Sequence, residues 1–302
     1  MTDPNEVGEP DLDGTVSWRA LLLETEVLLE RSGASGNPKM DAKWILEEVT
    51  GTSGAEFVDA MDGCATVRGV AQLDAMVARR TSGEPIQYVL GHWAFRNLDL
   101  LVDQRVLIPR PETEVVAGLA IDEIDRLEKP QASVVDLGTG SGAIGLAIAT
   151  ERPGTHVVLT DRSEAALAVA RANLAGLGRS GRSVTIQCGE WFAALPESQR
   201  GTVDLIVSNP PYIAHHEALD PSVVDWEPEM ALRSNDDGFD DLRLIVRESM
   251  DWLTTNGVLV LEMAPGQTAS VAELAEQVGF DAEVYRDVAG LERAVVARRT
   301  ET

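Results

Sequence analysis

The sequence has few cysteines, with only Cys64 and Cys188 among its 302 residues. Because these two lie far apart and outside any repeated spacing, they provide neither a disulfide framework nor a cluster of metal ligands. The chain also lacks any apolar run near the roughly 20 residues that a membrane-spanning helix requires. We therefore expect a soluble protein of the reduced cytoplasm, with no metal site and no membrane partner.

Basic residues are scarce as well. Lys and Arg number 25 against 50 Asp and Glu, which gives a formal net charge of −25. Proteins that bind nucleic acid gain much of their affinity by neutralising phosphates, and a chain this acidic repels them at long range. The charge argues against a DNA or RNA substrate, although a local basic groove or an adaptation to salt or solubility stays compatible with it.

The first residues lack both the basic start and the apolar core of a signal peptide. We expect 1–15 to be a disordered acidic tail and 16–82 to be a helical domain, since apolar residues recur there at helical spacing. Within it, Asn37-Pro38 is typical of a helix start, and Gly33 of a helix stop. A linker over 83–111 follows, in which alternating apolar residues at 86, 88 and 90 and then at 98, 100 and 102 predict a β-hairpin.

From residue 112 to 302 short apolar strands alternate with helices. Strands are expected at 134–137, 157–160, 184–187, 203–207, 258–262, 281–286 and 293–298. Helices are expected at 143–150, 163–177, 242–253 and 269–278. Such alternation predicts an α/β domain whose mostly parallel sheet is covered by helices on both faces.

A glycine-rich turn joins the first of these strands to its helix. The strand ends in Asp136-Leu137, and the turn continues as Gly138-Thr139-Gly140-Ser141-Gly142. Glycine permits positive φ and lets a ligand approach the backbone, while the helix start presents free N–H groups. Asp161, at the end of the second strand, has the position from which an acidic residue binds a ribose diol. The pattern predicts a nucleoside-cofactor site, although a tight turn that serves packing alone would look the same.

The charge of the turn favours one cofactor over another. The residues from Gly140 to Gly145 match the dinucleotide pattern GxGxxG. However, the carboxylate of Asp136 suits the cationic S-adenosylmethionine and repels the pyrophosphate of a dinucleotide. Glu190 and Trp191, which follow the third strand, could frame an adenine ring by hydrogen bonding and stacking, although Trp191 could equally be a core residue.

The sequence Ser208-Asn209-Pro210-Pro211-Tyr212 follows the fourth strand, at the sheet edge where open α/β sheets bind ligands. The Asn209 side-chain carbonyl and the Pro210 backbone carbonyl supply two acceptors, which match the two donors of a planar –NH₂ group. Held in this way, the nitrogen lone pair would turn toward the methyl donor. Pro211 and Tyr212 offer an apolar wall. The alternative interpretation of this box is an ordinary Asn-Pro turn.

Taken together, these motifs resemble those of the release factor glutamine methyltransferases, the HemK/PrmC type. The resemblance covers nearly all of the chain after the first 15 residues. Its most specific motifs are Arg79-Arg80-x-x-Gly83-Glu84-Pro85-Ile86-Gln87-Tyr88-Val89-Leu90-Gly91, then Phe95, then Val106-Leu107-Ile108-Pro109-Arg110-Pro111-Glu112-Thr113-Glu114, and Glu227-Pro228-x-x-Ala231-Leu232. Asn97 departs from the family, which more commonly has a small residue in the hairpin, and the acidic tail has no counterpart.

The resemblance implies a seven-stranded, Rossmann-like class I methyltransferase domain, preceded by a small helical domain and a β-hairpin linker. It implies methyl transfer from S-adenosylmethionine to the glutamine amide nitrogen, N5, of the Gly-Gly-Gln motif in class-1 peptide chain release factors. The helical domain would hold that protein substrate. By this resemblance the cofactor would be bound by Asp136, Leu137, Gly138, Thr139, Gly140, Asp161 and Trp191; the chemistry of the residues themselves leads us to expect Glu190 and Asn209 in the same site. The glutamine would be bound by Asn209, Pro210, Pro211 and Tyr212, with Asn209, Pro210 and Tyr212 as the catalytic set.

Three other functions are compatible with parts of the sequence. A methyltransferase for the amino group of adenine or guanine in DNA or RNA would use the same Asn-Pro-Pro-Tyr chemistry, but the net charge and the linker motif argue against it. A catalytically silent cofactor-binding subunit would not need intact acceptors at 209–212. A nicotinamide dehydrogenase would need an acid such as His or Lys at a strand end, whereas His215-His216 falls in an expected loop.

Overall fold

The computed structural model describes residues 15–235 and 237–300. The tail expected at 1–15 therefore lies almost wholly outside the described residues. The chain divides into two compact units, Met1–Leu90 and Gly91–Thr302. Their boundary falls within the segment that the sequence analysis assigns to a linker, and each unit is described by itself.

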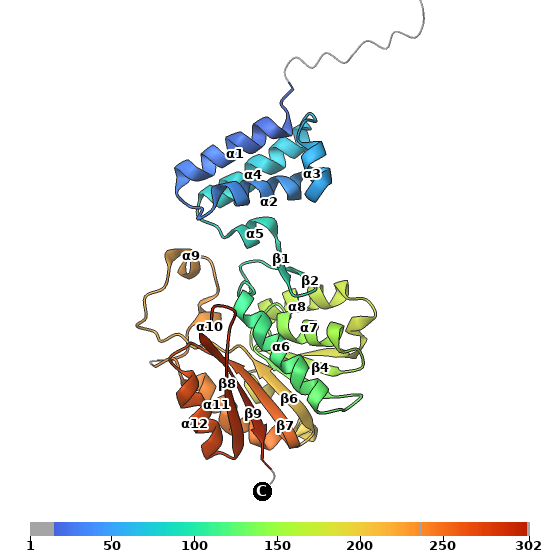
Figure 1. Ribbon diagram of the computed structural model, residues 1–302, viewed down its shortest axis with the longest axis vertical. Helices are drawn as coiled ribbons and strands as arrows, with labels where there is room; N and C mark the ends of the chain where they lie inside the picture. Colours follow the sequence, from blue (N-terminus) through green and yellow to red (C-terminus); the bar gives the residue numbers. More distant parts are fainter. Residues whose placement is uncertain (1–14, 236, 301–302) are drawn as a thin grey trace, which may run out of the picture. The chain divides into compact units, whose positions relative to one another are not determined.

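The described part of the first unit is helical (Figure 1). Its helices are α1 (Trp18–Ser32), α2 (Pro38–Thr50), α3 (Gly54–Ala60), α4 (Val67–Thr81) and α5 (Ile86–Leu90). The expected helix signals are confirmed. The Asn37 side chain accepts from Met40 N at 3.3 Å at the start of α2, and Gly33 ends α1 in the left-handed conformation. The unit has its own apolar core, which includes the fully buried Leu29, Ile45 and Leu46.

The strand expected at 86, 88 and 90 is wrong, because these residues form the short helix α5. Pro85 opens this helix, and its carbonyl accepts from the backbone N–H groups of Tyr88 and Val89. At the other end, the Arg79 guanidinium donates to the Tyr88 and Val89 carbonyls at 2.7 and 3.1 Å. A helix of five residues is too short to show a 3.6-residue period, so apolar spacing alone could not distinguish it from a strand.

The second unit contains a seven-stranded sheet in the order β5-β4-β3-β6-β7-β9-β8. The strands are β3 (Ser133–Leu137), β4 (His156–Asp161), β5 (Val184–Cys188), β6 (Val203–Ser208), β7 (Leu253–Glu262), β8 (Phe280–Arg286) and β9 (Glu292–Arg299). The strands from β5 to β7 pair in parallel, while β9 is antiparallel to both of its neighbours. The predicted α/β class and mostly parallel sheet are confirmed.

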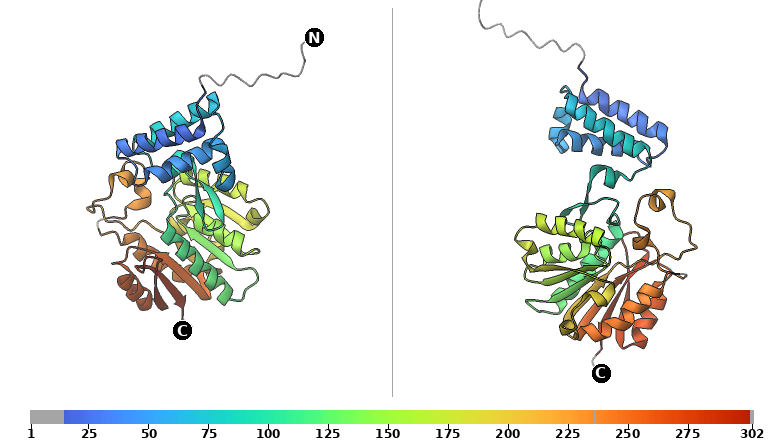
Figure 2. Two further views of the ribbon diagram at one scale, coloured as in Figure 1. Left: turned by 45° about the horizontal axis from the view of Figure 1, so that its top comes forward. Right: turned by 180° about the vertical axis from the view of Figure 1, so that it is seen from behind.

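Helices cover both faces of this sheet (Figures 1 and 2). The helices of one layer are α6 (Pro111–Arg126), α7 (Ala143–Glu151) and α8 (Glu164–Gly176), and those of the other are α11 (Asp240–Trp252) and α12 (Thr268–Gln277). The chain moves outward from β3 to β5 and then returns to place β6 on the other side of β3. Because crossovers between parallel strands are right-handed, this reversal puts the helices on opposite faces and opens a crevice where β3 and β6 end.

Short elements complete the second unit. They are β1 (His92–Phe95), β2 (Leu98–Leu101), η1 (Ser180–Ser183), η2 (Trp191–Ala194), η3 (Glu197–Gln199), α9 (Pro221–Val224) and α10 (Glu229–Leu232). The β1–β2 hairpin is fixed to the sheet domain by Asn173 of α8, which exchanges hydrogen bonds with the Leu101 backbone at 2.7 and 3.1 Å. The same side chain donates to the Ser141 carbonyl at 2.8 Å. One residue of α8 therefore connects the hairpin to the glycine turn.

Candidate active site

The glycine turn and the Asn-Pro-Pro-Tyr box begin side by side, because β3 and β6 are neighbours. Leu137 pairs with Ser208 in the parallel register, and the buried Ser208 hydroxyl donates to the Leu137 carbonyl at 2.7 Å. Both segments leave the sheet at its carboxyl edge. The structure therefore brings together two motifs that lie about 70 residues apart in the chain.

Two positions require glycine because another side chain lies close to the backbone: Gly138 in the turn and Gly145 in helix α7. Gly138 has φ +69°, and a Cβ at this position would lie 3.2 Å from Cζ3 of Trp191. Gly145, in the first turns of α7, is more restricted, since a Cβ there would lie 2.2 Å from the Leu159 side chain. Glycine at 138 leaves room for the indole ring, and glycine at 145 lets α7 pack directly against β4.

Asp136 lies beneath the turn and is almost fully buried. One carboxylate oxygen, Oδ2, accepts from the Thr139 hydroxyl at 2.6 Å and from Gly145 N at 2.9 Å. The other oxygen, Oδ1, is buried and has no hydrogen-bond partner among the described residues. Burial raises the pKa of Asp136 to about 6, against the effect of these two hydrogen bonds. Asp136 thus holds the turn in shape and keeps one acceptor unused.

Asp161 is the last residue of β4 and contacts the backbone of the turn. Its Oδ2 accepts from Gly140 N at 3.0 Å, and its Oδ1 accepts from Ser163 N at 2.8 Å. Burial raises the pKa of this carboxyl, which the backbone N–H groups of Ser163 and Gly140 counteract. Each carboxylate oxygen has two lone pairs, so Asp161 can still accept two hydroxyl donors.

Trp191 is the first residue of η2 and adopts a positive φ of 45°. Its indole N–H donates to Asp241 Oδ1 at 3.1 Å, and its ring packs against both the core and Gly138. Glu190 is exposed and forms an ion pair with Arg162 at 3.2 Å. Trp191 is therefore fixed as a wall of the site. Glu190 lies at the rim of the site, and its pairing with Arg162 was not predicted from the sequence.

In the Asn-Pro-Pro-Tyr box, the amide nitrogen of Asn209 is occupied by a partner from a distant helix. Asn209 Nδ2 donates to the Thr113 hydroxyl of α6 at 3.2 Å. Pro210 is buried, while the Tyr212 carbonyl accepts from Gln267 Nε2 at 3.0 Å. Burial raises the pKa of the Tyr212 phenol to about 12, so this group stays neutral and cannot act as a base near pH 7.

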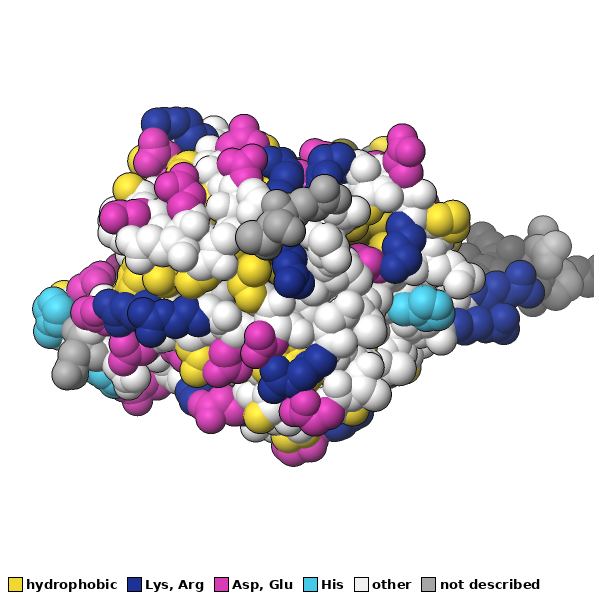
Figure 3. Space-filling view, turned by 90° about the horizontal axis from the view of Figure 1, so that it is seen from below, with side chains coloured by type: hydrophobic (Ala, Val, Ile, Leu, Met, Phe, Trp, Pro, Cys, Tyr) yellow, Lys and Arg dark blue, Asp and Glu magenta, His cyan; other side chains and the backbone are white. Residues whose placement is uncertain are grey.

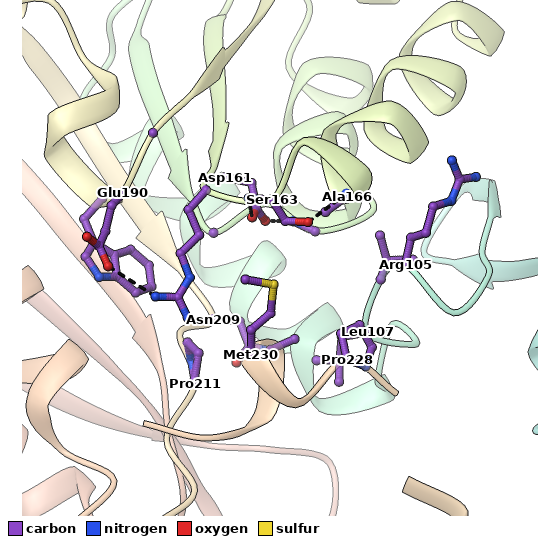
Figure 4. Close-up of a pocket in the computed structure, with 17 residues that line it drawn as sticks. Arg105, Leu107, Asp161, Ser163, Ala166, Glu190, Asn209, Pro211, Pro228 and Met230 are labelled. Carbon is purple, nitrogen blue, oxygen red and sulfur yellow. Dashed lines mark hydrogen bonds and ion pairs between the residues drawn. The ribbon is translucent and has the colours of Figure 1, made fainter. Parts of the chain in front are cut away.

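A pocket of about 680 Å³, including its open mouth, lies between the turn and the box. In the view of Figure 4, Met230 lies between Asp161 and Asn209. Predicted residues that line this pocket are Gly138, Gly140, Asp161, Glu190, Trp191, Asn209 and Pro211. An adjoining cavity of about 410 Å³, including its open mouth, is lined by Asp136 and Thr139 and shares Gly138, Gly140 and Asn209 with the pocket. Leu137, Pro210 and Tyr212 line neither cavity.

Several residues that shape this pocket carry no local signal of a binding role in the sequence. Arg105, Val106 and Leu107 come from the segment before α6, and Pro228, Met230 and Ala231 from the segment around α10. The two segments are joined by Glu227, a buried carboxylate that accepts from Ile108 N at 3.0 Å and forms an ion pair with Arg110. Val106, Leu107, Pro228 and Ala231 belong to the motifs quoted above, but a contact across more than 110 residues leaves no trace in local spacing.

Comparisons with known proteins identify relatives for both units. The family described as PrmC N-terminal domain matches residues 20–91, and the family described as Methyltransferase small domain matches 121–226. A release factor glutamine methyltransferase from Burkholderia pseudomallei is 39% identical over 269 residues, which is 86% of this chain and 92% of the relative. One from Deinococcus radiodurans is 37% identical over 285 residues, 93% of this chain and 98% of the relative.

One solved structure among the matches is a release factor-specific protein-(glutamine-N5) methyltransferase from Alicyclobacillus acidocaldarius. It is 28% identical, with a TM-score of 0.39, and the match covers 64% of this chain and 94% of that one.

Proposed function

The chain belongs to the release factor glutamine methyltransferase family, and from that premise we propose that its pocket methylates a glutamine side chain of a protein. The reaction is methyl transfer from S-adenosylmethionine to N5 of the glutamine in the Gly-Gly-Gln motif of class-1 peptide chain release factors. The observation that carries this proposal is the orientation of Asn209. Its amide nitrogen is held by Thr113, so its carbonyl is free to accept from an incoming –NH₂ group.

The residues of the pocket fit S-adenosylmethionine. When bound, this cofactor supplies an electrophilic methyl group on a sulfonium. The spare acceptor Oδ1 of Asp136 and the buried carboxylate of Asp161 favour a cationic ligand that carries a ribose diol. The ring of Trp191, packed against Gly138, forms a flat wall on one side of the pocket. A pyrophosphate would face two carboxylates here, so a dinucleotide fits poorly.

Asn209 orients the substrate nitrogen. Its carbonyl and that of Pro210 accept the two N–H donors of the glutamine amide, which directs the nitrogen lone pair away from both acceptors and toward the pocket. The amide nitrogen is a poor nucleophile because its lone pair is conjugated with the carbonyl. Two fixed acceptors favour the pyramidal nitrogen of the transition state over this conjugated ground state. Once it is methylated, the nitrogen is positively charged and strongly acidic, and it loses one proton to water without the need for a strong base.

The acceptor is a protein because the chain offers little to a phosphate backbone. The net charge is −25, and Figure 3 shows one face on which acidic and basic side chains of the described residues are interspersed. No helix in the described ranges, 15–235 and 237–300, is long and apolar enough to cross a membrane. The helical unit, which matches the PrmC N-terminal domain family, is the part that would hold the release factor, in the cytoplasm where translation terminates.

Labelled methyl transfer tests this function. In three parallel reactions, the protein and labelled S-adenosylmethionine would be incubated with a purified class-1 release factor, with duplex DNA or with ribosomal RNA. We expect label on the release factor, and none after its Gly-Gly-Gln glutamine is replaced. Label on either nucleic acid, with none on the protein, would support a base-amino methyltransferase instead.

A further inference from the structure

Part of the pocket is lined by residues 227–234, whose position depends on contacts with other segments. Other lining residues lie at the ends of strands, such as Asp161 at the end of β4 and Asn209 directly after β6. Between β6 and α11, by contrast, the described residues form only two helices, α9 and α10, of four residues each. A helix of one turn is not stable by itself, so the 227–234 segment must be fixed by its partners.

The carboxyl-terminal end of this segment is attached to the chain that leaves the Asn-Pro-Pro-Tyr box. Ile213 N donates to the Leu232 carbonyl at 3.1 Å, and Ser234 N donates to the Ile213 carbonyl at 3.0 Å. The Arg233 guanidinium also donates to the Ala214 carbonyl at 2.8 Å. These are mainly backbone contacts, so this end of the segment follows the course of the box.

The amino-terminal end is attached through one side chain, that of Glu227. Its carboxylate is 2% exposed, accepts from Ile108 N at 3.0 Å and forms an ion pair with the Arg110 guanidinium. Ile108 and Arg110 belong to the chain just before α6, which also lines the pocket through Leu107. A buried carboxylate is tolerated only with such partners. The contact therefore determines where the 227–234 segment lies relative to the pocket.

Three residues between these two attachments line the pocket, namely Pro228, Met230 and Ala231. In Figure 4 the Met230 side chain lies between Asp161 and Asn209. Met230 is 43% exposed, so it has apolar surface left for a bound molecule to cover. Its unbranched thioether side chain can adapt to the irregular outline of a ligand.

We propose that Met230 is a cofactor-binding residue, which encloses S-adenosylmethionine in the pocket, and that Glu227 is the positioning residue that holds Met230 there. This inference rests on the proposed function, because the methyl donor must stay bound while a protein substrate docks. A side chain that covers the cofactor must move before the cofactor can leave, so enclosure acts mainly on the dissociation rate. Glu227 touches no reacting atom and should not affect the chemical step.

Dissociation of labelled S-adenosylmethionine, chased with excess unlabelled cofactor and with no release factor added, tests the role of Glu227. Glu227→Gln keeps an acceptor for Ile108 N but loses the charge that pairs with Arg110, and we expect dissociation at least tenfold faster than in the wild type. Glu229→Gln is the matched control, since it makes the same change at an exposed side chain of α10 and should stay within twofold. Arg110→Met should add little to Glu227→Gln, because both remove one contact.

Variants of Met230 test the same inference without disturbing a buried charge. Met230→Ala should accelerate dissociation at least fivefold, whereas Met230→Leu, which has nearly the same volume, should stay within twofold. In steady-state assays with release factor, Glu227→Gln should raise the KM for S-adenosylmethionine at least tenfold with kcat within threefold of the wild type. A merely structural role for Glu227 would lower kcat as well.

An unchanged dissociation rate in Met230→Ala, or equal acceleration in Glu227→Gln and Glu229→Gln, would overturn the inference. If Glu227→Gln does not fold, the two Met230 variants decide the matter. The chase needs no methyl transfer, so the two proposals can fail separately. A wild-type protein that shows the expected dissociation rates but transfers no methyl group to a release factor would contradict the proposed function alone.

Discussion

The indole ring of Trp191 lies against the backbone of Gly138, so closely that a Cβ on Gly138 would be 3.2 Å from Cζ3 of the ring. The ring is held in place from behind by a hydrogen bond from its N–H to Asp241 at 3.1 Å. Two segments about 50 residues apart thus form one wall of the pocket. The wall has little freedom to adapt, because Gly138 has a positive φ and Trp191 is tied to α11.

Gly138→Ala should therefore weaken cofactor binding. The substitution is strained at φ +69° by about 1–2 kcal/mol, and the new methyl group would displace the Trp191 ring from the pocket wall. Isothermal titration calorimetry with S-adenosylhomocysteine would measure a loss of roughly tenfold. The matched control is Gly176→Ala at the end of α8, where a Cβ meets nothing within 4 Å. An equal loss of affinity in both variants would contradict the role of this wall.

Asp161→Ala should reduce cofactor affinity by about 1–3 kcal/mol, because it leaves the ribose hydroxyls unpaired. It also removes the acceptor for Gly140 N and Ser163 N, so the turn itself should loosen. Asp161→Asn keeps one acceptor and should lose less. Calorimetry of both variants decides the order, and NAD serves as the negative control. Tight binding of NAD without binding of S-adenosylhomocysteine would show that the cofactor has been misassigned.

Cofactor affinity should increase as the pH rises through about 6. Burial raises the pKa of Asp136 to about 6, so the carboxyl is neutral below this pH and anionic above it. A cationic ligand binds the anionic form more tightly, and by linkage it lowers the pKa of Asp136 when bound. The dissociation constant of S-adenosylmethionine, measured from pH 5 to 8, should fall and then level off. An affinity that is constant over this range would mean that Asp136 does not interact with the charge of the cofactor.

Glu262, the buried last residue of β7, should make the protein less stable as the pH rises. Burial raises its folded-state pKa to about 7, above the ordinary value of 4.5. The resulting contribution to stability is thus present below pH 4.5 and is lost as the pH rises through 7. The full shift corresponds to about 3 kcal/mol. Chemical denaturation at pH 5 and pH 8 should show this loss in the wild type and a smaller one in Glu262→Gln. If the free energy of unfolding changed equally with pH in the two proteins, Glu262 would not be the cause of the loss.

Sequence and structure agree best where one local signal suffices. Ser163 predicts the start of α8, and the structure shows its hydroxyl accepting from Ala166 N at 3.2 Å. The glycine turn and the Asn-Pro-Pro-Tyr box are recognisable for the same reason, because each is a short segment with its own chemistry. Their proximity follows from strand order. The strand expected at 86–90 fails, since five residues are too few to reveal a period.

The partners of the site could not be predicted, because they depend on tertiary contacts. Thr113 meets Asn209 across 96 residues, and Glu227 reaches Ile108 across 119. Neither contact leaves a periodic pattern, and α6 itself was not foreseen by the spacing of its apolar residues. The chemistry of the acceptor group was therefore readable from the sequence, whereas the side chains that orient it required the fold.

Asn209 is the residue on which the chemical account depends. Asn209→Ala should lower the rate at saturating substrate by roughly a hundredfold or more, since losing one positioned hydrogen bond costs about 2–4 kcal/mol in the transition state. Asn209→Asp adds a negative charge, which stabilises the cationic reactant more than the charge-dispersed transition state, so this variant should also be slower than the wild type. Because it keeps an acceptor for the substrate N–H group, it should be impaired less severely than Asn209→Ala.

The most direct measurement of the central claim is single-turnover methyl transfer to a purified class-1 release factor, followed by mass spectrometry of the Gly-Gly-Gln peptide. The wild-type protein should add one methyl group to the glutamine side chain. Asn209→Ala should do so at least a hundredfold more slowly, with the affinity for S-adenosylhomocysteine nearly unchanged. A near-wild-type rate for Asn209→Ala, or a methyl group found elsewhere in the release factor, would contradict the account.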